Sequence, residues 1–518
     1  MQRRDFLRLA GCGALGAVLA PRAASGAEAA PGQPNILLIM SDEHNATVLG
    51  ANGNAIVQTP NLDRLAASGV SFDACYCNSP LCVPSRESFL SGQYISRTGV
   101  WSNDCELPRA DTPAVPSLLN AAGYESYLCG KMHLAGDRRY GYTDTGGNFN
   151  TNIKTGHVSR RRADDLPGKG LSNRFDSFHA GDRSSILDHD EKVTRGTVEF
   201  LRNRKPGGKP FFLTAGYLAP HFPLIVPEKY WKAYEGRVPM PNLPPGYLEA
   251  LPLNYKHMRA GFQMEHVPPE VVKRGRELYY GLTQWLDEQV GQVLAALRAS
   301  PFAQNTVIVY TADHGENMGE HGLWWKNAMF DSAARVPLIV SGSPRWQGGA
   351  RRAGACSLVD VARTLVELGG GTAPADWDGA SMLPWLARAD APWKDRAVVE
   401  YYSHPIASGY AMIRQGPYKY TYHTPADDTH PAERELYDLR TDPGELKNLA
   451  GDPALAAKVA ELHAALLAEL KEHPDVTERR CRADGARAQQ AGEAQKGKGA
   501  GKKKDKGAKR RAAAAEGA

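Results

Sequence analysis

Short apolar runs alternate with helical patterns over most of the chain. Between the runs, residues 59–69 and 112–123 each begin with Thr-Pro and end at a glycine, as helices commonly do. Residues 276–300 have the spacing of a long amphipathic helix. Five runs have the length and composition of buried parallel strands: 35–40, 124–129, 210–216, 305–312 and 336–342. This alternation predicts an α/β fold with a mostly parallel central sheet flanked by helices.

The pattern changes after about residue 393. Three runs there alternate like antiparallel strands, and an amphipathic helix follows them: 397–403, 410–415, 418–423 and 455–472. Earlier in the chain, residues 143–183 are polar and show little periodicity. A segment of this kind predicts a long surface excursion that borders a substrate cleft and helps set specificity.

Positive charge is concentrated at the two ends of the chain. Residues 1–27 carry four Arg and one Asp, and residues 491–518 carry nine Lys or Arg against three acids. Because the whole chain is only +5, the body between these ends is slightly acidic, and no nucleic-acid partner is expected. We therefore divide the chain into four parts: an export signal over 1–27, a main α/β domain over 28–390, a smaller C-terminal α+β subdomain over 391–475 and a disordered basic tail over 476–518.

Residues 1–27 have the features of a Tat export signal. Arg3 and Arg4 form the twin-arginine pair, a short apolar run follows at 11–20, and small residues at 25–27 suit cleavage. We expect passage through the Tat translocon to the periplasm or the exterior. No other segment is long and apolar enough to cross a bilayer, so no stable membrane span is expected.

Cys82, in the stretch NSPLCVPSRESFLSG, could be a structural thiol, a metal ligand or a reactive centre. The eight cysteines show no regular disulfide framework. Cys75 and Cys77 could join Cys82 at a zinc ion, but no fourth ligand follows at a familiar spacing, so this alternative is not favoured. Cys12 lies in a segment that resembles a lipoprotein box, but a charged residue interrupts the apolar run before it, so lipidation is the minor option.

Charged and imidazole side chains follow four of the predicted strands. These residues are Asp42, Glu43, Lys131, His133, His221, Asp313 and His314. A single such ending would be explained by a helix cap or a surface turn. Because functional crevices lie beyond the carboxyl ends of parallel strands, four endings together predict a convergent site.

The expected site combines carboxylates with basic groups. Asp42, Glu43 and Asp313 would repel one another unless a cation lay between them, and oxygen ligands suit Ca²⁺, Mg²⁺ or Mn²⁺. His314 could add a nitrogen ligand. The basic groups predict a bound anion with several oxygens, such as sulfate or phosphate: Lys131, His133, His221 and Lys326.

These segments together resemble the sulfatase family, within the alkaline phosphatase superfamily. CVPSR, which begins at Cys82, fits the C-x-P-x-R signature of the family, and PNILLIMSDEH resembles its opening metal strand. Later blocks follow in the family's order: GYESYLCGKMHLAG, APHFP, TADHGENMGEHGLWWKNAMFDSAARVPLIV and ELYDLRTDPGELKNLA. The resemblance covers residues 33–453 and implies an alkaline-phosphatase-like fold with the catalytic domain over 28–390.

The resemblance implies that Cys82 is oxidised to formylglycine by a formylglycine-generating enzyme acting on the nascent chain. In the family, one hydroxyl of the hydrated aldehyde attacks sulfur and displaces the alcohol. Deprotonation of the second hydroxyl then expels sulfate. Arg86 would hold the diol, and the predicted helix that begins beside Cys82 would favour an anion.

The family's other roles transfer by position. The implied metal ligands are Asp42, Glu43, the modified Cys82, Asp313 and His314, with Ca²⁺ as the first choice and Mn²⁺ or Mg²⁺ as alternatives. The implied catalytic groups are Lys131 and His133, which contact formylglycine and sulfate, and His221 and Lys326, which bind sulfate and protonate the leaving oxygen. Asn103 matches an amide on the substrate side.

Two departures from the family pattern keep alternatives open. Glu43 replaces the more common Asp, and His314 stands where many arylsulfatases have Asn. Members with Asp-His at the latter position include carbohydrate and choline sulfatases, but also phosphonate monoester and phosphodiester hydrolases. Lys131 and His133 favour a sulfatase. A sulfated saccharide or other sulfated small molecule is the expected substrate, since a saccharide suits an exported enzyme. A non-catalytic binder of sulfated glycans is the remote alternative, since every expected catalytic position is occupied.

Overall fold

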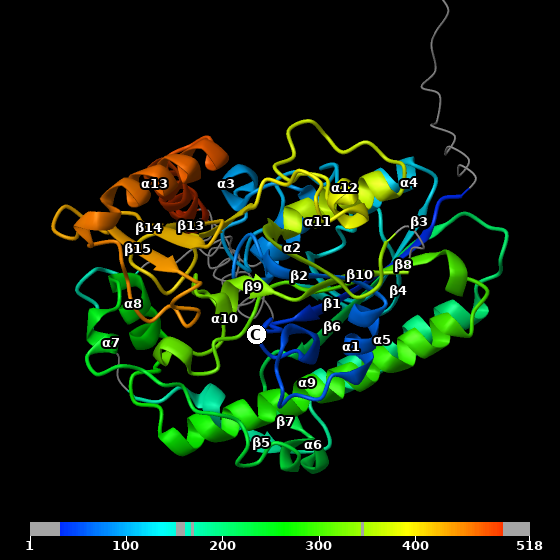
Figure 1. Cartoon of the computed structure of the whole chain (residues 1–518), viewed down its shortest axis with the longest axis horizontal. Helices are drawn as coiled ribbons and strands as arrows, with labels where there is room; N and C mark the ends of the chain where they lie inside the picture. Colours follow the sequence, from blue (N-terminus) through cyan, green and yellow to red (C-terminus); the bar gives the residue numbers. More distant parts are fainter. Residues whose placement is uncertain (1–31, 152–160, 167–169, 343–345, 491–518) are drawn as a thin grey trace, which may run out of the picture.

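The computed structural model describes residues 32–151, 161–166, 170–342 and 346–490. Its centre is a nine-stranded sheet with the order β11-β2-β10-β8-β1-β6-β3-β4, and β9 also pairs with β2 (Figure 1). The strands are β1 (Asn35–Asp42), β2 (Gly69–Tyr76), β3 (Glu125–Ala135), β4 (Thr143–Thr151), β6 (Phe211–Pro220), β8 (Thr306–Ala312), β9 (Arg335–Val336), β10 (Leu338–Ser341) and β11 (Ala350–Ser357). The neighbours β8, β1, β6 and β3 are parallel, which confirms the predicted α/β architecture.

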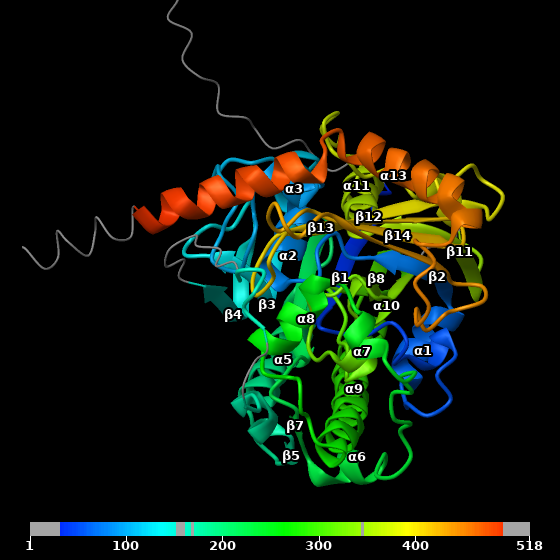
Figure 2. The same ribbon diagram turned by 90° about the vertical axis from the view of Figure 1, so that its left-hand side faces the viewer.

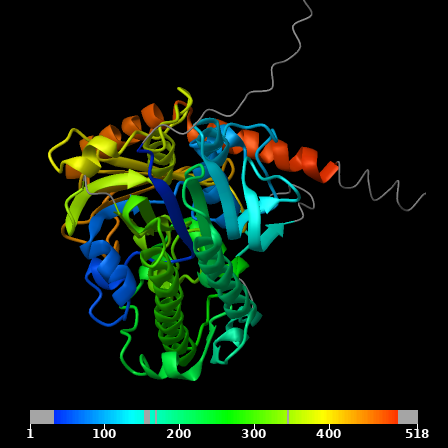
Figure 3. The ribbon, with the colours of Figure 1, turned by 90° about the vertical axis from the view of Figure 1, so that its right-hand side faces the viewer.

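Helices cover both faces of the sheet. On one face lie α1 (Pro60–Ala67), α5 (Ser185–Asn203) and α9 (Pro269–Arg298); α5 and α9 run side by side (Figure 3). On the other lie α2 (Cys82–Ser91), α4 (Val115–Ala121) and α11 (Leu358–Leu368). The strands β1 and β6 are buried at every position, as expected for strands covered on both sides.

The remaining short elements lie outside these layers. They are α3 (Ile95–Thr98), α6 (Glu228–Lys232), α7 (Tyr247–Ala250), α8 (Leu253–Gly261), α10 (Asp331–Ala334), α12 (Leu383–Ala387), β5 (His179–Ala180), β7 (Ile225–Val226) and the 3-10 turns at Gly50–Asn52, Asn173–Ser177, Ala303–Asn305, Glu320–Gly322 and Pro453–Leu455. In the described part of the chain, every helix is too short or too polar to cross a bilayer.

Two sequence predictions for the main domain need correction. The run at 336–342 forms β10, but it pairs antiparallel with β8 and β2, because a buried apolar strand has the same pattern in either direction. Residues 143–151 form the edge strand β4, parallel to β3, within the predicted surface excursion. The Gly, Asn and Thr residues of β4 lack the apolar alternation from which a strand is predicted.

The C-terminal subdomain is an antiparallel meander of β12 (Arg396–Tyr401), β13 (Tyr410–Gln415), β14 (Tyr418–His423) and β15 (Glu433–Asp438), with α13 (Ala456–Leu470) packed against β13 and β14. The tail boundary predicted at residue 476 is wrong. Residues 474–490 are helical and extend beyond α13 past α3 (Figure 2). Cys481 is buried there with Trp101 and Tyr402, so this helix has apolar contacts that a disordered tail lacks. The twin-arginine segment and residues 491–518 lie outside the described residues.

Candidate active site

The carboxyl ends of four adjacent parallel strands meet at one edge of the sheet. Asp42 ends β1 and Asp313 follows β8; the paired neighbours Ser41 and Ala312 bring these two carboxylates together. The end of β3 contributes Lys131 and His133, and His221 follows β6. The predicted convergence of polar strand endings is therefore present in the structure.

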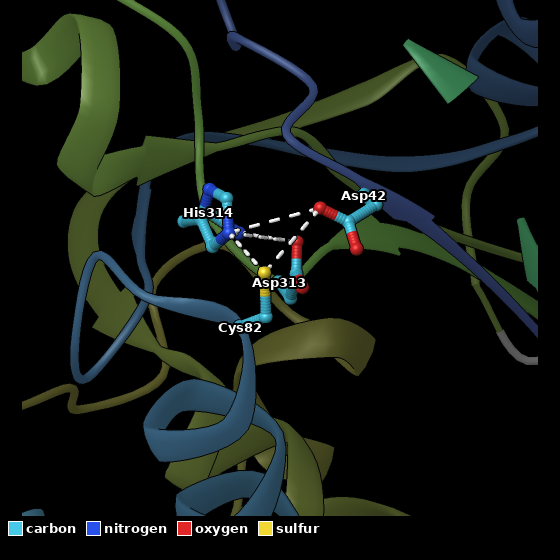
Figure 4. Close-up of side chains that lie close together, drawn as sticks. All are labelled: Asp42, Cys82, Asp313 and His314. Atoms are coloured by element: carbon cyan, nitrogen blue, oxygen red, sulfur yellow. Dashed lines mark hydrogen bonds and ion pairs between the residues drawn. The ribbon is translucent and has the colours of Figure 1, made fainter. Parts of the chain in front are cut away.

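Cys82 is the first residue of α2, and its sulfur lies beside Asp42, Asp313 and His314 (Figure 4). Its Sγ is 3.3 Å from His314 Nε2, 3.3 Å from Lys326 Nζ and 3.8 Å from Asp42 Oδ1. His133 also hydrogen-bonds the sulfur. Burial raises the pKa of the Cys82 thiol, but the nearby positive charges, above all Lys131 and Lys326, hold it well below its usual value. The surroundings therefore stabilise negative charge at position 82.

Four side chains offer ligand atoms to a common point. One atom from each of Asp42, Cys82, Asp313 and His314 lies within 4.8 Å of the others (Figure 4). His314 Nδ1 lies 3.0 Å from the Gly315 carbonyl oxygen, so a proton on Nδ1 leaves the Nε2 lone pair directed at the cluster. Burial lowers the pKa of His314, yet Asp313 raises it to about 9 overall, which shows how strongly the carboxylates favour a positive charge here.

A second group of ligand atoms consists of Asp42, Glu43 and His221. Glu43 Oε2 lies 3.1 Å from Lys326 Nζ and 3.2 Å from His221 Nε2, whereas its Oε1 is buried without a hydrogen-bond partner among the described residues. Burial raises the pKa of Glu43 to about 7. A buried carboxylate beside two other residues that offer an oxygen and a nitrogen ligand atom fits a hard divalent cation.

Arg86 lies one turn along α2 and holds the two central carboxylates. Its Nε is 2.7 Å from Asp313 Oδ2, and a terminal nitrogen is 3.3 Å from Asp42 Oδ2. A further nitrogen donates to the Lys131 carbonyl oxygen at 2.8 Å, while the Lys131 ammonium pairs with Asp42. Arg86 therefore contacts both carboxylates directly.

Asn103 is also close to the site but has a structural contact. Its Oδ1 accepts a hydrogen bond from the Val83 backbone N–H at 3.0 Å. This contact satisfies an amide in the first turn of α2, next to Cys82. The structure thus places Asn103 beside Cys82 and gives its oxygen a role in fixing the helix start.

The backbone around the site is strained at several non-glycine positions. Glu43, His133, Trp325 and Asn327 have φ values of 65°, 60°, 64° and 81°. Residues of this kind adopt left-handed conformations rarely, and such conformations cluster at functional sites because the surrounding structure must hold them. Here they turn the chain sharply at the strand ends and on both sides of Lys326.

Three supporting residues were missed from the sequence. Ser85 Oγ donates to the Asp313 carbonyl oxygen at 2.6 Å, and Tyr279 OH donates to the Glu43 carbonyl oxygen at 2.6 Å. Glu316 Oε1 accepts from the Trp325 N–H at 2.5 Å and so shapes the turn before Lys326. Glu316 follows Asp-His-Gly and could have been suspected, but Tyr279 lies inside the long helix α9 with no local pattern to mark it.

The family models that match the chain place it among the hydrolases of the alkaline phosphatase superfamily. Within it, the chain belongs to the sulfatase family, whose model, described as "Sulfatase", matches residues 34–371. A model described as "N-sulphoglucosamine sulphohydrolase, C-terminal" matches residues 319–473.

Curated relatives and solved structures agree with this assignment. A choline-sulfatase of Rhizobium meliloti is 29% identical over 451 residues, which cover 82% of this chain and 83% of that protein. An N-acetylglucosamine-6-O-sulfatase of Bacteroides thetaiotaomicron is 26% identical, covering 86% of this chain and 87% of the relative. The chain is therefore a sulfatase-family enzyme that hydrolyses sulfate esters.

Two solved structures share the fold. One protein, in complex with its substrate D-glucosamine-2-N,6-O-disulfate, superposes with a TM-score of 0.66 at 24% identity, over 86% of this chain and 99% of that one. The phosphonate monoester hydrolase of Agrobacterium radiobacter superposes with a TM-score of 0.70 at 24% identity, over 84% of this chain and 95% of that one. The predicted alkaline-phosphatase-like architecture is thus confirmed.

Proposed function

We propose that Cys82 is converted to formylglycine and that the modified residue is the nucleophile in sulfate-ester hydrolysis. When present, the hydrated aldehyde supplies the attacking hydroxyl group. The observation that carries the proposal is the convergence on residue 82: His314 and Lys326 lie 3.3 Å from its sulfur, at the start of α2. These positive groups and the helix start suit a nucleophile that becomes negatively charged and binds a transferring sulfuryl group.

Other side chains of the site take distinct roles in this reaction. Lys131 and Lys326 stabilise the negative charge of the sulfate oxygens, and Arg86 keeps Asp42 and Asp313 in place. His221 and Lys326 flank Glu43 and can deliver a proton to the leaving oxygen. His133 contacts position 82 and is the base that removes the proton of its second hydroxyl group.

A divalent cation completes the proposed site. Its ligands would be Asp42, Glu43, Asp313, His314 and the modified residue 82. These carboxylates suit Ca²⁺, Mg²⁺ or Mn²⁺, and Ca²⁺ is the ion proposed first. When bound, the cation polarises the sulfate group and lowers the pKa of the attacking hydroxyl group.

Mass spectrometry of the peptide containing Cys82, combined with sulfate release measured by ion chromatography, tests the proposal. We expect the mass of formylglycine in active protein and loss of sulfate release by at least about 10³-fold in Cys82→Ala. An unmodified thiol in fully active protein would contradict it. The matched control is Cys75→Ala, another buried cysteine on the neighbouring strand β2, which should stay active wherever it folds.

The natural substrate is proposed to be a sulfated saccharide or other small sulfate ester. The names of the curated relatives support this class, since they include a glucosamine sulfatase and a choline-sulfatase. A phosphonate monoester or phosphodiester hydrolase is the second candidate, supported by the shared fold of the phosphonate monoester hydrolase. Comparing kcat/KM for 4-nitrophenyl sulfate and 4-nitrophenyl phenylphosphonate distinguishes the two, and a preference for the phosphonate would reject the sulfatase proposal.

Export by the Tat pathway is proposed from the twin arginines at positions 3 and 4. Cell fractionation of the full chain should find the enzyme outside the cytoplasm. Replacing both arginines by lysine should retain it in the cytoplasm, and unchanged export of that variant would reject this route.

A further inference from the structure

Arg174, in the 3-10 turn Asn173–Ser177, presents its guanidinium group to three aromatic rings. The guanidinium carbon lies 4.7 Å from the Phe222 ring centroid, 4.8 Å from Trp325 and 5.3 Å from Phe262. Aromatic faces attract cations, so the rings fix the position of this charge without neutralising it.

No carboxylate among the described residues forms an ion pair with Arg174, and its side chain remains partly exposed. The acidic groups that act on it electrostatically, Glu43 and Glu316, are buried in the site beneath. A guanidinium group that is held rigidly, is partly exposed and lacks a carboxylate partner is suited to bind an anion that arrives with a ligand.

The rings that hold Arg174 also connect it to the catalytic groups. Phe222 stacks on the His221 imidazole with ring centroids 4.3 Å apart, and Lys326 Nζ lies 5.7 Å from the same Phe222 centroid. Trp325 immediately precedes Lys326 in the chain. Because His221 and Lys326 are the proposed donors to the leaving oxygen, Arg174 lies on the side of the site where the alcohol part of the ester would depart.

We propose that Arg174 binds a second anionic group, a carboxylate or a second sulfate, on the alcohol part of the substrate. The proposal rests on the proposed sulfatase function and refines its substrate class to multiply charged sulfate esters. The aromatic cluster of Phe222, Phe262 and Trp325 could otherwise hold a cationic alcohol such as choline, but Arg174 occupies it with a positive charge of the protein itself.

Kinetics on matched pairs of substrates test this assignment. One pair is 4-nitrophenyl sulfate and a ring-carboxylated 4-nitrophenyl sulfate; the other is D-glucosamine 6-O-sulfate and D-glucosamine-2-N,6-O-disulfate. We expect Arg174→Ala to lower kcat/KM by about 10- to 100-fold for the doubly anionic member and by less than about threefold for the other. Each ratio compares one substrate on two proteins, so differences in leaving-group acidity cancel.

Two further variants separate charge from packing. Arg174→Lys should have a higher kcat/KM for the doubly anionic substrates than Arg174→Ala, because the charge remains, but a lower one than wild type, because the bidentate geometry is lost. Arg183→Ala, at an exposed arginine of the same segment that pairs with Asp188, should leave all ratios unchanged. If only the disulfated sugar responds to Arg174→Ala, the second group is a sulfate; if only the carboxylated aryl sulfate responds, it is a carboxylate.

If Arg174→Ala lowers kcat/KM equally for both substrates of each pair, the proposal is overturned and Arg174 is a structural residue. A wild-type preference for choline sulfate over the anionic esters would overturn it as well. Binding in the inactive Cys82→Ala background, measured by calorimetry with the disulfated sugar, distinguishes this failure from failure of the proposed function. A drop in affinity on adding Arg174→Ala supports the anion site even if sulfate release is absent.

Discussion

Two clusters of buried charges differ in how their groups are arranged. The catalytic cluster consists of Asp42, Glu43, Arg86, Lys131, Asp313 and Lys326. The joining cluster consists of Tyr76, Asp331, Lys419 and Glu445 and connects the C-terminal sheet to the main domain. In the joining cluster, Lys419 Nζ lies 2.8 Å from Asp331 Oδ1 and 2.6 Å from Glu445 Oε1.

The comparison shows how similar residues serve different purposes. In the joining cluster, one lysine lies directly between its carboxylates, and the pairs hold two sheets together. In the catalytic cluster, ligand atoms from different segments converge within 4.8 Å. A left-handed backbone occurs in both clusters, at Glu43 with φ 65° and at Glu445 with φ 53°. The first arrangement provides stability, whereas the second gathers ligand atoms around one point, as a cation site requires.

Lys326→Met should therefore reduce catalysis much more than stability. We expect kcat to fall by about 10⁴-fold, because the variant loses the cation that is proposed to bind the sulfate group and to protonate the leaving oxygen. The free energy of unfolding should fall, but by less than the roughly 3–5 kcal/mol expected for a buried charge left without any partner, since Glu43 keeps its contact with His221. Single-turnover kinetics and urea unfolding measure the two effects.

The matched control is Lys256→Met, which removes another lysine from the same chain outside both clusters and should leave kcat unchanged. If Lys326→Met instead unfolds the protein while the folded fraction keeps its activity, the catalytic cluster would be structural, like the joining cluster.

Lys419→Met should have the opposite effect. Removing this lysine leaves Glu445 buried without its cation, while Asp331 keeps its ion pair with Arg335, at 2.9 Å. We expect this to cost about 3–5 kcal/mol of unfolding free energy. The folded fraction should keep kcat within about threefold of wild type. Lys458→Met is the control, because Lys458 is partly exposed and pairs with Glu461 on the surface of α13, where an ion pair contributes about 1 kcal/mol or less.

The buried strands and the polar residues at their ends could be predicted from the sequence, but the edge of the sheet could not. Strands β1, β6 and β8 are buried on both sides, so their apolar runs are continuous, and polar residues stand out where each strand ends. Strand β4 could not be predicted, because an edge strand of Gly, Asn and Thr has no apolar face to mark it.

Contacts between distant segments were less predictable than the catalytic residues themselves. Lys419 and Asp331 lie 88 positions apart and meet only because the C-terminal sheet docks on the main domain. Arg174 belongs to a polar segment without periodicity, and its neighbours Phe222 and Trp325 come from two other segments. Local patterns in a sequence record which face of an element is buried, but not which distant side chain will lie against it.

Removing divalent ions should affect only the catalytic cluster. Dialysis against a chelator should stop sulfate release and lower the unfolding free energy by about 2.7 kcal/mol relative to protein with the ion at 100 times its Kd. Chelation should lower the unfolding free energy of Lys419→Met by the same amount, since the joining cluster does not bring ligand atoms to a shared point. Thermal unfolding with and without added Ca²⁺ measures this, and unchanged activity after chelation would reject a metal in the site.

Glu87 can be compared with the carboxylates of both clusters, because it is a buried carboxylate that belongs to neither of them. It lies on α2, and neither of its oxygens has a hydrogen-bond partner among the described residues. Burial raises its pKa to about 8, with Glu106 adding to the shift and Arg138 opposing it. Since the folded state holds the proton more tightly than the unfolded chain, the stability contributed by protonated Glu87 is complete below pH 4.5 and is lost as the pH rises toward 8.

Glu87→Gln should remove this dependence on pH. Wild type should lose about 1 kcal/mol more unfolding free energy than the variant between pH 6 and pH 7, as measured by urea unfolding at each pH. The exposed Glu199 of α5 supplies the control Glu199→Gln, whose pH profile should match that of wild type. Parallel profiles for wild type and Glu87→Gln would mean that Glu87 is ionised in the folded state and has a cation partner, as the carboxylates of the two clusters do.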